Sequence, residues 1–231
     1  AIETAVASID IDNSTSGNIE IDEVDGILVQ ELDNDVGDDS DAATGKISVV
    51  AGGVITVVSG GAGVDAIDGD ISLDANGVNS DVVVEAVIGA SLLGGVVITA
   101  DDSVTFTVAG DITVSGTGGV SITANGVDTV GDGGDVITMS DGTVIDGGSG
   151  MIVMAAGGTN GGDITVGGLV TTNVGTTSVV VTTSGGVIDA GDVDVEVASG
   201  GRLVIDAVEG VGSGGAIETA VASIDIDNST S

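Results

Sequence analysis

Carboxylates are the only side chains in this sequence that are numerous enough to suggest a chemistry. The chain has 37 Asp and Glu residues against two Lys and Arg residues, and it has neither His nor Cys. Nucleophilic catalysis by a Ser–His or Cys–His pair is therefore excluded, and so is a disulfide scaffold. What remains is chemistry that carboxylates carry out alone, namely acid–base catalysis or cation binding.

Five closely spaced aspartates form the strongest candidate for a cation site. Ca²⁺ takes about six to eight hard oxygen ligands of this kind. The spacing lacks the full EF-hand pattern with its terminal Glu, so two alternatives stay open: a specific site for Ca²⁺ or another cation, and a solvated acidic loop. We expect no other cofactor to be required. The five residues are Asp33, Asp35, Asp38, Asp39 and Asp41.

Cleavage of polysaccharides is the enzymatic alternative. Lyases that act on acidic sugars typically need cationic side chains, and only Lys46 and Arg202 could serve, far apart in the sequence. Glycosidases need one acid of raised pKa beside an ionised one, but among so many acids some pair always lies close. Phe106 is the only aromatic residue, which removes the usual platform for stacking a sugar. We therefore expect no enzymatic activity.

The net charge of −35 restricts the partners. Nucleic-acid binding needs a basic footprint, so we expect no nucleic-acid partner. Residues 82–100 are apolar and long enough for a membrane span, but Glu85 and three glycines interrupt them. We expect buried strands joined by a glycine turn there, and no membrane insertion.

The elements that must position the carboxylates are predicted to be strands. Aliphatic and acidic residues alternate over residues 9–12, 19–22 and 192–197. In a strand, this alternation puts every carboxylate on one face and every aliphatic group on the other. No window shows the apolar spacing and caps of a helix, so we expect no significant helix.

The strand starts share a pattern of glycine, a polar residue and a short aliphatic run. The steps from Gly17 to Gly45 and from Gly45 to Gly69 both lie in the twenties. Hairpin sandwiches place strands every 8–12 residues or so, whereas spacings in the twenties indicate coils of a parallel β-helix. The sequence predicts an all-β, single-stranded parallel β-helix (β-solenoid) of about ten coils at about 4.8 Å per coil. The starts that show the pattern are Gly17, Gly45, Gly69, Gly110 and Gly162.

A long internal repeat defines the organisation. Residues 1–16 reappear letter for letter as residues 216–231, so the period is 215. The sequence therefore predicts that residues 1–231 are one continuous solenoid segment of a tandem array. Its expected partners are neighbouring repeats placed end to end, in the same chain or in a polymer.

The runs over residues 110–126, 131–150 and 161–173 resemble the tandem repeats of giant bacterial surface proteins of the filamentous-haemagglutinin-like type. The resemblance implies a right-handed parallel β-helix and export to the cell surface or the medium. It also implies roles in adhesion, filaments or matrix, and it brings no catalytic residues with it.

We therefore expect a structural extracellular repeat that forms an elongated rod, fibre or matrix filament on or outside a bacterial cell. The alternative is an adhesin module that binds a cell-surface or matrix partner through projecting acidic loops, such as residues 30–44, with calcium dependence. Carboxylates stacked about 4.8 Å apart repel by about 1 kcal/mol even in water. We expect the rod to require salt or divalent cations for this reason.

Overall fold

The computed structural model describes residues 1–36, 45–124, 135–157, 161–191 and 194–228. Within these ranges every regular element is a β-strand, and the strands form one sheet of ten and one sheet of sixteen. The pairings in both sheets are parallel. The all-β fold expected from the sequence is confirmed.

The ten-stranded sheet, here called sheet A, runs the whole length of the molecule. Each of its strands pairs with the next one along the axis rather than with its neighbour in the sequence. In axial order the strands are β1 (Ile2–Thr4), β3 (Ile19–Glu23), β5 (Ile47–Ala51), β8 (Ile71–Ala75), β11 (Val96–Ala100), β14 (Val120–Ala124), β17 (Ile152–Ala156), β20 (Val179–Thr183), β23 (Arg202–Ala207) and β26 (Ser223–Asp227).

The sixteen-stranded sheet, sheet B, has two arms that meet at the long strand β4 (Ile27–Asn34), which also pairs with β2 (Ser8–Asn13). The first arm consists of β6 (Ile55–Val57), β9 (Val82–Val84), β12 (Val104–Phe106), β15 (Ile137–Met139), β18 (Ile164–Val166), β21 (Gly186–Asp189) and β24 (Gly210–Val211). The second arm consists of β7 (Gly63–Ala66), β10 (Ile88–Ala90), β13 (Ile112–Val114), β16 (Val144–Asp146), β19 (Gly168–Thr171), β22 (Val197–Ser199) and β25 (Thr219–Ala220).

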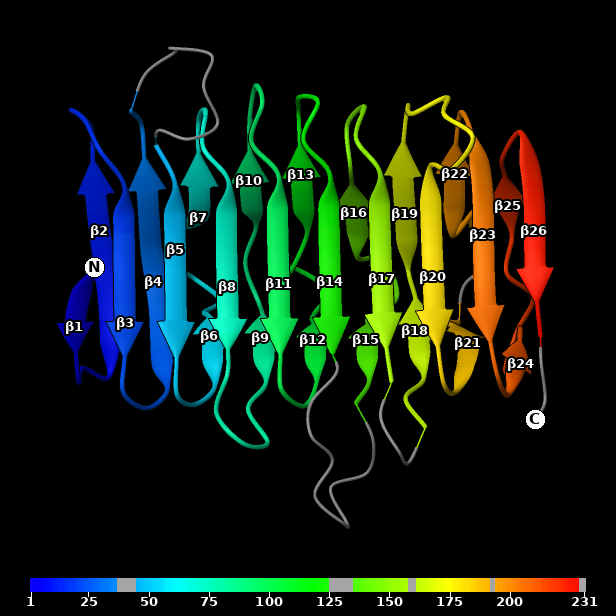
Figure 1. Cartoon of the computed structure of the whole chain (residues 1–231), viewed down its shortest axis with the longest axis horizontal. Coiled ribbons are helices and arrows are strands. Elements are labelled where there is room, and N and C mark those ends of the chain that lie inside the picture. Colours follow the sequence, from blue (N-terminus) through cyan, green and yellow to red (C-terminus); the bar gives the residue numbers. More distant parts are fainter. Residues whose placement is uncertain (37–44, 125–134, 158–160, 192–193, 229–231) are drawn as a thin grey trace.

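Each full turn takes one strand from sheet A and one from each arm of sheet B, as β5, β6 and β7 do. The near strands run down and the far strands run up while the chain advances from left to right, which is a right-handed coil (Figure 1). The solenoid has about eight turns rather than the expected ten. Some turns are longer than expected, such as the one from Val120 at the start of β14 to Ile152 at the start of β17.

Five strands follow the glycines that the sequence predicted as strand starts. In all five cases the strand starts shortly after the glycine, at Ile19, Ile47, Ile71, Ile112 and Ile164. Gly17 and Gly45 have φ angles of 92° and 70°, in the left-handed region that favours glycine. Gly116 serves packing instead, because a Cβ there would lie 1.5 Å from the carbonyl oxygen of Leu92 in the preceding coil.

Aliphatic columns fill the narrow interior. Because the strands pair in register, the inward side chains of successive coils stack along the axis, and burying each one stabilises the fold by about 1.5–3 kcal/mol. Phe106 is fully buried in such a column, between its ladder partners Val84 and Met139. The column in the middle of sheet A consists of Ile2, Ile21, Val49, Leu73, Ile98, Ile122, Met154, Val181, Ile205 and Ile226.

The apolar stretch over residues 82–100 contributes alternate side chains to this interior, while Val87, Leu92 and Val97 are exposed. It forms β9, β10 and β11, with a turn around Ser91 between the last two, and alternate side chains of each strand are buried. Among the described residues, no helix is long and apolar enough to cross a membrane.

Candidate cation site

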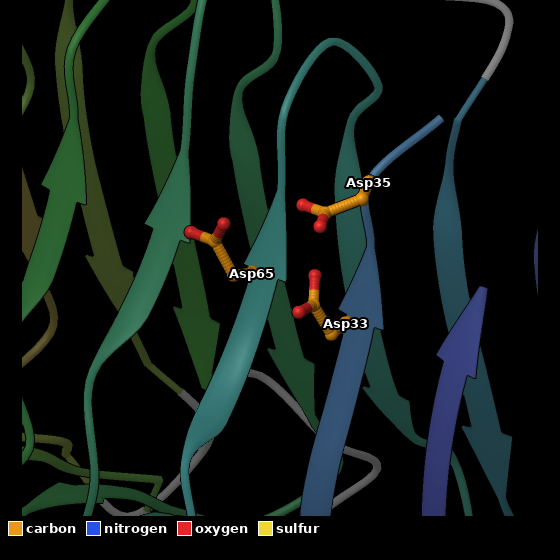
Figure 2. A group of neighbouring side chains, drawn as sticks. All are labelled: Asp33, Asp35 and Asp65. Atoms are coloured by element: carbon orange, nitrogen blue, oxygen red, sulfur yellow. The ribbon is translucent and has the colours of Figure 1, made fainter. Parts of the chain in front are cut away.

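Three aspartates gather where β4 meets the second arm of sheet B. In β4, the buried Leu32 precedes the half-buried Asp33, and Asp35 follows the end of the strand. In β7, Val64 and Ala66 point inward, so Asp65 between them points outward. Figure 2 shows Asp33 and Asp35 at one strand and Asp65 at its neighbour.

The backbone ladder fixes this grouping. Asp33 and Asp65 are direct pairing partners between β4 and β7, and the backbone N–H of Asp35 donates to the carbonyl oxygen of Asn13 at 3.1 Å. One carboxylate oxygen from each of the three aspartates lies within 4.8 Å of the others. Three hard oxygen ligands at this spacing could hold a Ca²⁺ ion, with further ligands supplied by water or backbone carbonyls.

The same column contains a fourth carboxylate. Asp12 of β2 pairs with Asp33 on the side opposite Asp65, so Asp33 has an acidic neighbour in the coil before and in the coil after. The next residue along the column is Gly89, where a Cβ would lie 2.3 Å from Oδ1 of Asp65. The missing side chain at Gly89 therefore gives the Asp65 carboxylate its space.

Burial and mutual repulsion both act on these acids. Burial raises the pKa of the Asp33 carboxyl, and the charge of Asp35 raises it further, followed by smaller effects of Asp65, Asp12 and Glu31. Burial also raises the pKa of Asp65, with a further contribution from Asp35. Oδ1 of Asp33 is buried and has no hydrogen-bond partner in the described part of the chain. The described part of the site thus concentrates negative charge on three neighbouring carboxylates.

Among the described strands, ladder pairs of two carboxylates lie near the two ends of the molecule rather than in its middle coils. The equivalent outward column of the first arm carries threonines in its middle coils, with Thr105, Thr138 and Thr165 as successive partners. In sheet A, Asp74 has Val50 and Thr99 as its ladder neighbours, and burial alone raises its pKa. Direct acid–acid pairs therefore lie in the first coils, as between Asp12, Asp33 and Asp65, and again in the last coil, where Asp206 pairs with Asp227.

Two buried glutamates form a second class of carboxylate. Glu23 accepts hydrogen bonds from the Thr4 hydroxyl and from the backbone N–H of Val6 at 3.2 Å. The Thr4 hydroxyl is the main cause that holds the pKa of Glu23 below its usual value, against the opposing effect of burial. Glu196 accepts from the backbone N–H of Glu218, and burial raises its pKa, with the Glu218 carboxyl adding to the effect.

The structure brings together two of the five aspartates suggested by the sequence, Asp33 and Asp35, and adds Asp65 to them. Asp38, Asp39 and Asp41 lie outside the described residues. Asp65 escaped the sequence analysis because it lies a whole coil after Asp33 in the chain. Asp65 could have been identified as a neighbour of Asp33 because it occupies an outward strand position about one coil later in the sequence.

No family model, no curated protein and no solved structure matches this chain.

Proposed function

We propose that this chain is a structural repeat whose function is to supply length, as part of an extracellular rod, fibre or matrix filament of a bacterium. The observation that carries the proposal is the unbroken middle column of sheet A, from Ile2 in the first coil to Ile226 in the last. Each coil pairs with the coil before it along this column, so an added coil extends the axis.

The distribution of cationic side chains supports a non-catalytic role. Lys46 lies 3.9 Å from Asp70, and Arg202 pairs with Asp225. Lys46 precedes β5 and Arg202 begins β23, and five strands of sheet A separate these two strands. Neither cation can therefore assist the other in neutralising an acidic substrate.

A tandem chain tests the proposal, in which a second period follows residues 1–215. Small-angle scattering should show a maximum dimension longer by about 40 Å than that of the single period, at about 4.8 Å for each added turn, with an unchanged cross-section. Two compact bodies joined by a linker, or a wider cross-section, would contradict the proposal.

We further infer that Ca²⁺ binds the Asp33, Asp35 and Asp65 carboxylates and stabilises the first coils. The raised pKa values of Asp33 and Asp65 reflect a desolvation and a repulsion that a divalent cation would relieve. Calcium should raise the melting temperature of the wild-type chain relative to a chelator at equal ionic strength, and the Asp65→Asn variant should lose most of that increase.

Asp74→Asn is the matched control for this test, because Asp74 is also desolvated but has no acidic ladder neighbour. Its calcium response should equal that of the wild type. Equal responses of both variants would contradict a specific site. The adhesin alternative, which relies on the acidic loop, stays a prediction because residues 37–44 lie outside the described part of the chain.

A further inference from the structure

Two glutamates meet between successive coils of the second arm of sheet B, where β22 and β25 lie side by side (Figure 1). Val197 of β22 pairs with Thr219 of β25, so the residues before them, Glu196 and Glu218, are neighbours across the same two coils. The backbone N–H of Val197 donates to the carbonyl oxygen of Glu218 at 3.2 Å. The two carboxyl groups are close enough for one to donate a hydrogen bond to the other.

This contact arises from the placement of the duplicated segment. In the first copy (residues 1–16), β1 lies in sheet A and β2 lies in sheet B. In the second copy (residues 216–231), β25 lies in sheet B and β26 lies in sheet A. Glu3, which is the counterpart of Glu218 in the first copy, is exposed and pairs with Asp22 in sheet A. The same glutamate is therefore exposed in one copy and set against a buried acid in the other.

Glu196 is the more enclosed member of the pair, with 3% of its surface exposed. Its Oε2 accepts a hydrogen bond from the backbone N–H of Glu218. Its Oε1 is buried and has no hydrogen-bond partner in the described part of the chain. Since a buried, ionised carboxylate oxygen without a partner is strongly disfavoured, the pair in its doubly charged form is incomplete.

The strands around the pair offer little to balance its charge. Within their bounds, β19 and β25 carry no titratable side chain. β23, which packs against β22, carries Asp206 and Arg202, and the guanidinium of Arg202 pairs with Asp225. Asp194, which precedes β22, is exposed and negative. The pair must therefore be neutralised from within or by something that it binds.

A single proton satisfies this pair better than a metal ion does. With one proton bound, one carboxyl group donates to the other, the buried oxygen gains a partner and the charge of the pair falls from two to one. Ca²⁺ takes about six to eight oxygen ligands, and the described residues bring no third acid to this place. Because like charges in contact oppose each other's ionisation, the two protons leave in separate steps that belong to the pair as a whole.

We propose that Glu196 and Glu218 share one proton and form a pH-sensitive latch between β22 and β25. While the proton is held, the O–H of one carboxyl group donates to the carboxylate of the other, and the two coils stay closed. Loss of this proton to water leaves two negative charges in contact, and their repulsion loosens β25. The latch is independent of the proposed rod function, because it concerns the closing of one coil rather than the length of the molecule.

Opening of the latch should follow pH in one direction. Burial raises the pKa of Glu196, and the Glu218 carboxyl adds to the effect, whereas the open coil exposes carboxyl groups with ordinary pKa values. The stabilisation is therefore fully present below the ordinary pKa and is lost as the pH rises through the raised one. Between these two values the closed latch holds one proton more than the open one, so opening should become about tenfold more favourable for each pH unit.

Amide hydrogen exchange of the whole chain tests the latch at the Val197 N–H. In the wild type, its protection factor should fall by about tenfold per pH unit across this window and should level off above it. In Glu196→Gln the side-chain amide donates permanently to Glu218 and still accepts from its backbone N–H. This variant should therefore keep its protection high and independent of pH.

Glu209→Gln is the matched control, because Glu209 is an exposed acid beside β24, and it should keep the pH dependence of the wild type. Circular dichroism checks that each variant folds, and Glu218→Gln provides the same test if Glu196→Gln does not. Carbon-13 NMR of the carboxyl groups should show both glutamates of the wild type titrating in the same two steps. Wild-type protection that ignores pH, a Gln variant that keeps the wild-type dependence, or two independent single-step titrations would each overturn the latch.

Discussion

The two copies of the duplicated segment share every residue, yet different contacts hold them. In the first copy Ile9 and Ile11 are partly buried and pack against the core, whereas their counterparts Ile224 and Ile226 are about half exposed. The first copy contacts the buried Glu23 and the second contacts the buried Glu196. An alternating sequence therefore specifies a strand with one apolar face, while the neighbouring coil decides which sheet accepts it.

The largest expected loss of stability comes from truncating a buried side chain in the middle column of sheet A. Ile98→Ala removes a fully buried side chain between Leu73 and Ile122 and should lower the free energy of unfolding by about 2–5 kcal/mol. Ile226→Ala, in the second copy, should cost under about 1 kcal/mol because the side chain is half exposed. Urea unfolding of dilute protein at low salt measures both. Equal losses would show that the second copy is as tightly packed as the interior.

The buried glutamates should respond to neutralisation in opposite directions. Glu23→Gln removes a charged acceptor of hydrogen bonds from the first copy, so it should lower the melting temperature. Glu196→Gln removes a desolvated charge beside Glu218, so it should leave the melting temperature unchanged or raise it. Thermal melts at neutral pH should separate the two variants by about 2–4 °C or more. Shifts of the same sign would contradict the different roles assigned to the two copies.

The stability of the fold should respond to pH in two opposite ways. The raised pKa values of Asp33, Asp65 and Glu196 provide stability that is present below their ordinary pKa and is lost as the pH rises through the raised value. Stability should therefore increase as the pH falls from neutral through these raised values. The lowered pKa of Glu23 acts oppositely, since its contribution is lost once the pH falls through the lowered value.

Melting curves across this range, with Asp33→Asn beside the wild type, measure both responses. The melting temperature of the variant should rise less than that of the wild type as the pH falls from neutral. At the acidic end, where Glu23 becomes protonated, both melting temperatures should fall. A wild-type melting temperature that falls steadily from neutral pH downward would refute the role assigned to the aspartates.

The smallest effects should come from the exposed ion pairs at the two ends. The N-terminal amine lies 3.4 Å from Glu20 beside the first copy, and Arg202 pairs with Asp225 in the second. All four groups are roughly half exposed, so Glu20→Gln and Arg202→Ala should each cost about 0–1 kcal/mol. A larger loss for Arg202→Ala alone, in urea unfolding, would mean that this pair fixes the second copy in sheet A.

Much of the fold could be predicted from the sequence because its signals are local. The glycine starts place β3, β5, β8, β13 and β18 correctly. Alternation was less reliable near the C-terminal end, since only Val197 of residues 194–197 lies in a strand and Val195 is 47% exposed. For the cation site, the sequence indicated Asp33 and Asp35 but not Asp65, because that contact joins different coils.

The sequence by itself determined that the chain forms short strands, which side chains point inward, and that the strands stack as parallel coils. These properties depend on alternation within a strand and on glycine at its start. Only the tertiary structure decided which carboxylates meet and which sheet accepts each copy of the duplicated segment. The physical reason is that partners in a column lie one coil apart and that coil length varies. The coil from Ile47 to Ile71, for example, is shorter than the coil from Val120 to Ile152. Lateral register is therefore set by the packing of one coil on the next.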